Sequence, residues 1–171
     1  MEEILRVAKL AATAGGNVIS SYASSIGSLN IEQKSLNDFV SEVDRNSENA
    51  VNSIIRQHFP KHAIIGEEYG ASGELGSDFT WFVDPLDGTT NFLRSIPHYC
   101  VSIGVCHKGV PCVAVVFDPV KLELFTAIQG QGAQLNGNPI AIAQLGGLNG
   151  ALLATGVPFS GAYLDRLDQF L

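Results

Sequence analysis

The sequence predicts an α+β fold in which two helices come first and a series of antiparallel strands follows. In the first third of the chain, apolar residues recur every three and four positions, which is typical of amphipathic helices. From about residue 63 onward they form short runs or alternate, which is typical of strands. We therefore expect a layered α/β sandwich in which two helices pack on an antiparallel sheet.

Two core-facing helices are predicted. The first covers residues 4–22, and Gly15 and Gly16 within it are expected to weaken it slightly. A polar connection follows. The apolar stripe of the second helix runs from Val40 through Ser47 to Ile55, and the helix stops before Pro60 because proline cannot continue a helix.

Five strands are predicted from the apolar runs in the rest of the chain. Their ranges are 63–66, 79–83, 99–106, 110–117 and 122–128. Short breaks rich in Gly, Asp and Pro separate the later runs, which favours hairpin connections. We therefore expect an antiparallel meander.

Composition and charge exclude several classes of protein. The 171-residue chain has 10 Lys and Arg against 17 Asp and Glu, a net charge of −7, which argues against nucleic-acid binding and favours cation binding. The apolar runs are too short to span a membrane and the N-terminus lacks a secretory pattern, so we expect a cytoplasmic protein. Cys100, Cys106 and Cys112 are predicted to be reduced, buried thiols.

The densest cluster of chemically unusual residues is the segment 81–92, WFVDPLDGTTNF. We expect the apolar strand to end at Asp84, because the next residue is a proline. Asp87 follows three residues later, where a turn can bring both carboxylates to one cation. Asp87 then serves as a helix N-cap before Gly88 and Thr89, whose free amides attract an anion. This arrangement fits metal-assisted phosphoryl chemistry, although the same dipeptides also occur in ordinary turns.

Two further acidic positions add to this cluster. Glu67 lies in the Gly-Glu-Glu element at 66–68, after a predicted strand, and Asp44 lies near the start of the second helix. Taken alone, Glu67 is explained as a solvated loop carboxylate and Asp44 as an ordinary helix-terminal carboxylate. His98 is expected to be a hydrogen-bonded surface residue and not a phosphohistidine nucleophile.

Together, these stretches resemble the inositol monophosphatase family of magnesium-dependent, lithium-sensitive sugar-phosphate phosphatases. The sequence DPLDGTTNF at 84–92 matches the family signature at every position, and the elements at 66–68 and 37–44 stand in the family's order. With GQGAQLNG at 130–137, the resemblance covers essentially the whole chain. It is strongest to the bacterial-type inositol-1-monophosphatases.

The resemblance implies a magnesium site. Glu67, Asp84 and Asp87 would be the side-chain ligands of Mg²⁺, and the carbonyl of Leu86 would complete one site. Asp84 would bridge two ions. Lys34 would lie in a mobile loop that contributes to the metal region in relatives.

The resemblance also implies roles in binding and catalysis. Asp87, Gly88 and Thr89 would bind the substrate, with amides and a hydroxyl offered to its phosphate. Glu67, Thr89 and Asp44 would be the catalytic residues, because they would lie beside the water that attacks phosphorus.

Family members continue for about a hundred residues further, in keeping with a two-part build. We therefore expect residues 1–171 to be a single N-terminal metal-binding domain that lacks the C-terminal substrate domain and is nearly inactive alone. The apolar pattern of a last helix at 163–171 has no stop signal, in line with a fragment. A natural short form that no longer catalyses is the alternative.

Several functions remain open. The resemblance implies hydrolysis of inositol monophosphate or a related phosphate ester, and a homodimer is expected. Fructose-1,6-bisphosphatase and 3'-phosphoadenosine phosphatase activities share the metal motif. Some bacterial relatives are thought to assist transcription antitermination, which implies a protein partner and no direct contact with nucleic acid. A cation-binding domain without turnover is a further alternative.

Overall fold

The computed structural model describes residues 1–26, 31–35, 38–144 and 146–152. The helices are α1 (Glu2–Tyr22), α2 (Glu42–His58) and α3 (Thr89–Leu93). The strands are β1 (Ile31–Ser35), β2 (Asp38–Ser41), β3 (Ala63–Gly66), β4 (Gly70–Ser72), β5 (Phe79–Asp87), β6 (Cys100–His107), β7 (Val110–Asp118), β8 (Glu123–Ile128), β9 (Gly132–Leu135) and β10 (Asn138–Ile140).

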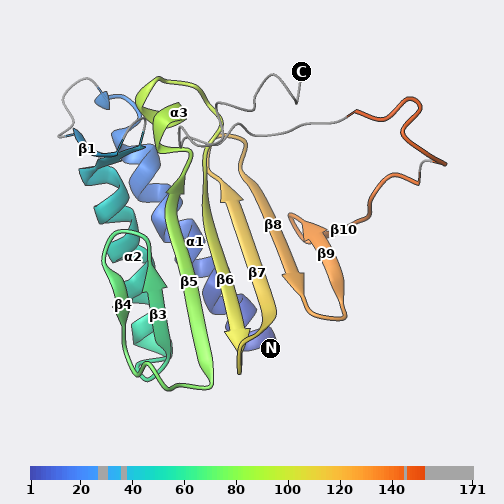
Figure 1. Cartoon of the computed structure of the whole chain (residues 1–171), viewed down its shortest axis with the longest axis horizontal. Coiled ribbons are helices and arrows are strands. Elements are labelled where there is room, and N and C mark those ends of the chain that lie inside the picture. The colour runs from blue at the N-terminus through green and yellow to red at the C-terminus, as the bar shows by residue number, and fades with distance from the viewer. Residues whose placement is uncertain (27–30, 36–37, 145, 153–171) are drawn as a thin grey trace.

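Eight strands form one sheet in the order β10-β9-β8-β7-β6-β5-β3-β4, and β1 and β2 form a separate antiparallel pair. The two long helices lie together on one face of the large sheet (Figure 1). The predicted α+β fold, with two helices packed on one sheet, is therefore confirmed.

The core lies between these helices and the sheet. Alternate residues of the central strands, such as Trp81, Val101 and Val115, are almost fully buried beneath the helices. The opposite face of the sheet, which we call the open face, is lined by Ile65 and Phe82, whose exposed fractions are 39% and 44%. No described helix covers this open face.

Two glycines let α1 approach its neighbours closely. A Cβ atom on Gly15 would lie 2.8 Å from Ser47 Oγ, and one on Gly16 would lie 2.5 Å from a carbon of the Phe117 ring. Both glycines are buried. The residues that were expected to weaken α1 are therefore the ones at which it meets α2 and β7.

The prediction of a purely antiparallel meander is wrong at one pair of strands, because β3 and β5 run parallel. The three-residue strand β4 pairs with the outer side of β3 and reverses the chain, so that β5 enters on the inner side in the same direction as β3. The sequence of β4 is Gly-Ala-Ser, which has little strand propensity and gave no signal.

Other elements also differ from the prediction. The polar connection contains the β1–β2 pair, so α2 begins only at Glu42, and β5 continues beyond Asp84 to Asp87. The β9–β10 hairpin was not predicted. Its turn is formed by Asn136 and Gly137, both at positive φ, which is the pattern of a type I′ turn. The helical pattern at 163–171 lies outside the described residues.

The three cysteines are free thiols, as predicted, but Cys112 alone among them is buried, and Cys100 and Cys106 are partly exposed. Among the residues that the structure places, none of the helices combines the length and the apolar character needed to cross a membrane.

A histidine in an aromatic stack provides a test of the core. The ring of His62 stacks between Phe59 and Phe79, and its Nδ1 accepts a hydrogen bond of 3.0 Å from Trp81 Nε1. Because Nδ1 is the acceptor, the folded state requires the neutral ring, and burial lowers the pKa of His62 from its usual 6.5.

We expect the emission of Trp81, the one tryptophan in the chain, to change as the pH falls through the lowered pKa of His62. His62→Phe keeps an aromatic ring in the stack and should make this emission independent of pH. His107→Phe, at the other side of Phe79, should leave the transition in place. Fluorescence titration measures both, and an unchanged transition in His62→Phe would contradict this account.

Candidate functional site

A β-bulge brings Asp84 and Asp87 to the same face of the sheet. Asp84 pairs with Ser102 of β6 and Asp87 pairs with Cys100, so three steps along β5 match two steps along β6. Side chains alternate along a strand, so residues three apart normally lie on opposite faces. The extra residue corrects this parity, and both carboxylates lie on the open face.

Glu67 meets Asp84 across two neighbouring strands. Glu67 follows β3 directly, its backbone N–H donates to the carbonyl of Val83 at 3.1 Å, and its carboxyl group interacts with that of Asp84. Burial, the charge and hydrogen bond of Glu67 and the charge of Asp87 raise the pKa of Asp84 to about 8. Like charges held together in this way favour the arrival of a cation.

Asp44 and Thr89 form a second part of the site. Asp44 lies in the first turn of α2 and is 2% exposed. The Thr89 hydroxyl lies 2.7 Å from Asp44 Oδ1 and 3.0 Å from the carbonyl oxygen of Leu86. The structure thus brings the distant residues Asp44 and Thr89 into direct contact, beside the bulge that carries Leu86.

Gly88 forms the junction between β5 and α3. It is the N-cap of α3, with a φ of 97°, whereas the sequence analysis placed the cap at Asp87. A Cβ atom on Gly88 would meet the carbonyl oxygen of His98 at 3.0 Å. Glycine is therefore required for both backbone conformation and space.

Lys34, which the resemblance places in a mobile loop, lies in strand β1.

The electrostatic field around these residues is negative. The Cys100 thiol lies 3.9 Å from Asp87 Oδ2. Burial, followed by the charges of Asp87, Asp84 and Asp118, raises the pKa of Cys100 to about 12. The thiol therefore stays protonated, and the site favours cations over anions until positive charge is bound.

Two hollows on the open face flank the carboxylates. The first, of about 440 Å³, is lined by Glu67 and Asp84 together with Ile65, Gly66, Phe82, Val83, Ser102 and Gly104. The second, of about 290 Å³, is lined by Asp87 and Gly88 together with Asn91, His98, Tyr99, Cys100, Val116, Asp118, Lys121, Glu123 and Phe125. Open space therefore lies beside Glu67 and Asp84 in the first hollow and beside Asp87 in the second.

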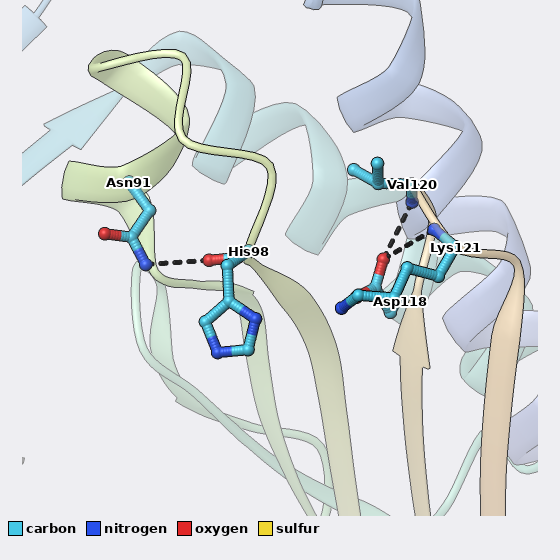
Figure 2. A network of polar contacts seen from close by, with 5 residues as sticks. All are labelled: Asn91, His98, Asp118, Val120 and Lys121. Atoms are coloured by element: carbon cyan, nitrogen blue, oxygen red, sulfur yellow. Dashed lines mark hydrogen bonds and ion pairs between the residues drawn. The ribbon is translucent and has the colours of Figure 1, made fainter.

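The second hollow is held in shape by structural hydrogen bonds (Figure 2). The carbonyl of His98 accepts from the Asn91 side chain at 2.7 Å, and Asp118 Oδ1 accepts from the amides of Val120 and Lys121 at 2.9 Å. Burial opposes the ionisation of Asp118, but the hydrogen bonds from Lys121 and Val120 outweigh it and lower its pKa. The side chain of His98 is exposed, in line with the expected surface position.

Within the described part of the chain, no three His, Cys, Asp or Glu side chains come close enough to form a complete metal cluster. Glu67 and Asp84 form a close pair, and Asp87 interacts with Asp84 through its charge. These oxygen donors, with the Leu86 carbonyl nearby, have the chemistry that Mg²⁺ prefers. They would provide part of a coordination sphere, and water and a phosphate would provide the rest.

Two polar residues of α2 were not recognised from the sequence. Ser47 and Glu48 are fully buried, next to Asp44 on the same helix face. The Ser47 hydroxyl donates to the carbonyl of Pro85 at 2.9 Å, within the bulge. The available signal was the spacing of Asp44, Ser47 and Glu48 at i, i+3 and i+4, although the predicted apolar stripe included only Ser47 of the three.

A family model described as the inositol monophosphatase family matches residues 1–164. The chain belongs to the inositol monophosphatase family. A relative from Pseudomonas aeruginosa, "Nus factor SuhB", is 43% identical over 174 residues, which is 100% of this chain and 64% of the relative. The chain therefore spans less than two thirds of this family member.

Solved structures of the inositol monophosphatase family share the fold. The inositol monophosphatase from Anabaena is 38% identical, with a TM-score of 0.73, and the match covers 86% of this chain and 52% of that one. A structure titled IMPase/NADP phosphatase, complexed with Mg²⁺ and phosphate, is 26% identical with a TM-score of 0.63, covering 72% of this chain and 48% of that one. The described part of the chain therefore has the fold of these two structures.

Proposed function

We propose that this chain holds the Mg²⁺-binding part of a phosphatase that hydrolyses inositol monophosphate, or a related sugar phosphate, to the alcohol and inorganic phosphate. The observation that supports this most directly is the meeting of Glu67 and Asp84, with Asp87 on the same face, beside the Asp44–Thr89 pair. The neighbour complexed with Mg²⁺ and phosphate agrees with this choice of ion and ligand.

The residues of this site would bind the ion and the phosphate. Glu67, Asp84, Asp87 and the Leu86 carbonyl would hold the ion, and Gly88 would give the phosphate room to approach the backbone. Bound Mg²⁺ would lower the pKa of a water and neutralise charge on the phosphate ester.

Asp44 and Thr89 would take part in proton transfer from the attacking water. The buried Asp44 carboxylate accepts a hydrogen bond from the Thr89 hydroxyl, so the hydroxyl oxygen can accept one from a water next to it. Glu67, exposed at the end of β3, would orient the same water from the other side. No covalent intermediate on the protein is needed.

Magnesium titration followed by calorimetry tests the proposal directly. We expect the wild-type chain to bind Mg²⁺ and Asp87→Asn to bind it at least about tenfold more weakly, because a charged ligand is lost. Asp78→Asn is the matched control, since Asp78 is an exposed aspartate at the other end of β5, paired with Lys108. Equal binding by Asp87→Asn and wild type would overturn the assignment.

Phosphate release from inositol 1-phosphate tests turnover. The chain spans 64% of its Pseudomonas relative, and we expect much slower hydrolysis than by a full-length inositol monophosphatase, with Mg²⁺ required. Rapid Mg²⁺-dependent turnover by the 171-residue chain would show that residues 1–171 contain every group the reaction needs. A panel with fructose 1,6-bisphosphate and 3'-phosphoadenosine phosphates tests the rival substrates.

A second candidate function is assistance to transcription through a protein partner. The name of the Pseudomonas relative, "Nus factor SuhB", favours it. The acidic net charge of −7 suits a basic protein surface. Asp87→Asn in the cellular gene separates the two functions: a phenotype that survives the loss of phosphate release assigns the cellular role to binding.

A further inference from the structure

Glu48 is a fully buried carboxylate near the proposed site. It lies on α2, and its oxygens accept hydrogen bonds from the backbone amides of Glu68 at 2.7 Å and Tyr69 at 3.3 Å. The side-chain amide of Asn52 donates a third, at 3.3 Å. Two of these three donors are backbone amides, and both belong to the turn that follows β3.

That turn carries Glu67. The amide of Glu67 is bonded to β5 through the Val83 carbonyl, and the two amides that follow it are bonded to Glu48. The backbone on both sides of Glu67 is therefore held, once by the sheet and once by α2. A side chain whose flanking peptides are fixed loses little further freedom when it coordinates an ion.

The residue before Glu67 is shaped to admit this carboxylate. A Cβ atom on Gly66 would lie less than 2 Å from Glu48 Oε1, so any side chain there would displace Glu48. Gly66 has an ordinary backbone conformation, because it is not among the glycines with positive φ. The absence of a side chain at Gly66 therefore serves the approach of Glu48 and not the backbone geometry of the turn.

We propose that Glu48 is a positioning residue, which anchors the turn after β3 and thereby sets the position of the Glu67 carboxylate against Asp84 and the affinity for Mg²⁺. The proposal rests on the magnesium site proposed above. Glu48 itself would contact neither the ion nor the substrate, because it is fully buried between α2 and the turn.

The test is Mg²⁺ affinity measured by calorimetry on the 171-residue chain. Glu48→Gln keeps the size of the side chain but presents an N–H₂ group to one of the two amides, so we expect Mg²⁺ to bind about tenfold more weakly. Val51→Ala is the matched control, since Val51 is fully buried one turn along α2. It should lower the melting temperature and leave Mg²⁺ affinity unchanged.

A double-mutant cycle with Glu67→Gln separates positioning from general loss of stability. If Glu48 acts through Glu67, Glu48→Gln should weaken Mg²⁺ binding in the wild-type background and have little effect in the Glu67→Gln background. Gly66→Ala is a second variant for the case in which Glu48→Gln folds poorly. It displaces the Glu48 carboxylate without changing its charge and should weaken Mg²⁺ binding in the same way.

The outcomes are distinct. Wild-type affinity in Glu48→Gln, equal losses in both backgrounds, or an equal loss in Val51→Ala would each overturn the role of Glu48 while the magnesium site stands. Absence of Mg²⁺ binding by the wild-type chain would overturn the proposed function itself.

Discussion

Asp84→Asn is expected to abolish tight Mg²⁺ binding and, at the same time, to stabilise the Mg²⁺-free protein at pH 8. The folded state raises the pKa of Asp84 from 3.8 to about 8, so between these values it binds a proton that the unfolded chain releases. The free energy of unfolding therefore falls as the pH rises from about 4 to about 8. Asparagine has no charge to bury or to repel Glu67, so it removes this loss.

The size of the effect is set by how far water screens the carboxyl. Asp84 is only partly buried, so we expect about 2 kcal/mol of the electrostatic cost to be recovered, or about 5 °C in melting temperature. Thermal unfolding from pH 4 to pH 8, with and without Mg²⁺, measures it. Asp78→Asn should follow the wild-type pH dependence, and a lower melting temperature for Asp84→Asn at pH 8 would contradict the argument.

Gly16→Ala is expected to destabilise the protein by about 2 kcal/mol, although alanine is the better helix former. Helix propensity favours alanine by about 1 kcal/mol. The new Cβ, however, would lie 2.5 Å from the ring of Phe117, which is 8% exposed and cannot move into solvent without opening the core. Overpacking of this kind costs about 3 kcal/mol at its upper range.

Urea unfolding gives the free energies for this comparison. Gly104→Ala is the matched control, because a Cβ on Gly104 meets nothing within 4 Å on the open face. It should be neutral or slightly stabilising, since alanine loses less backbone entropy on folding. A stability of Gly16→Ala at or above wild type would show that α1 can shift away from β7.

Residue periodicity was sufficient to predict the two long helices and the central strands, because both layers bury one apolar face. It could not predict that β3 and β5 are parallel. That pairing depends on β4, whose three small residues carry no apolar pattern. The β1–β2 pair was missed for a related reason, since its sequence is mostly polar and lacks an alternating apolar pattern.

The candidate site was predicted as a set of residues but not as a geometry. The sequence predicts a turn after the strand that brings Asp84 and Asp87 together, whereas β5 continues through both and a bulge aligns them. Ser47 was counted in the apolar stripe of the second helix and Glu48 was given no role, because a polar residue in a helix pattern does not reveal which backbone group it will meet. Such contacts depend on tertiary packing.

The bulge in β5 also presents backbone carbonyls to the residues packed around it. Deletion of one residue between Asp84 and Asp87 would remove the bulge, so that two steps along β5 match two steps along β6 and both aspartates still share the open face. The deletion would instead disturb the Pro85 carbonyl, which accepts from Ser47, and the Leu86 carbonyl, which accepts from Thr89. The extra residue therefore connects the two aspartates to α2 and to the start of α3.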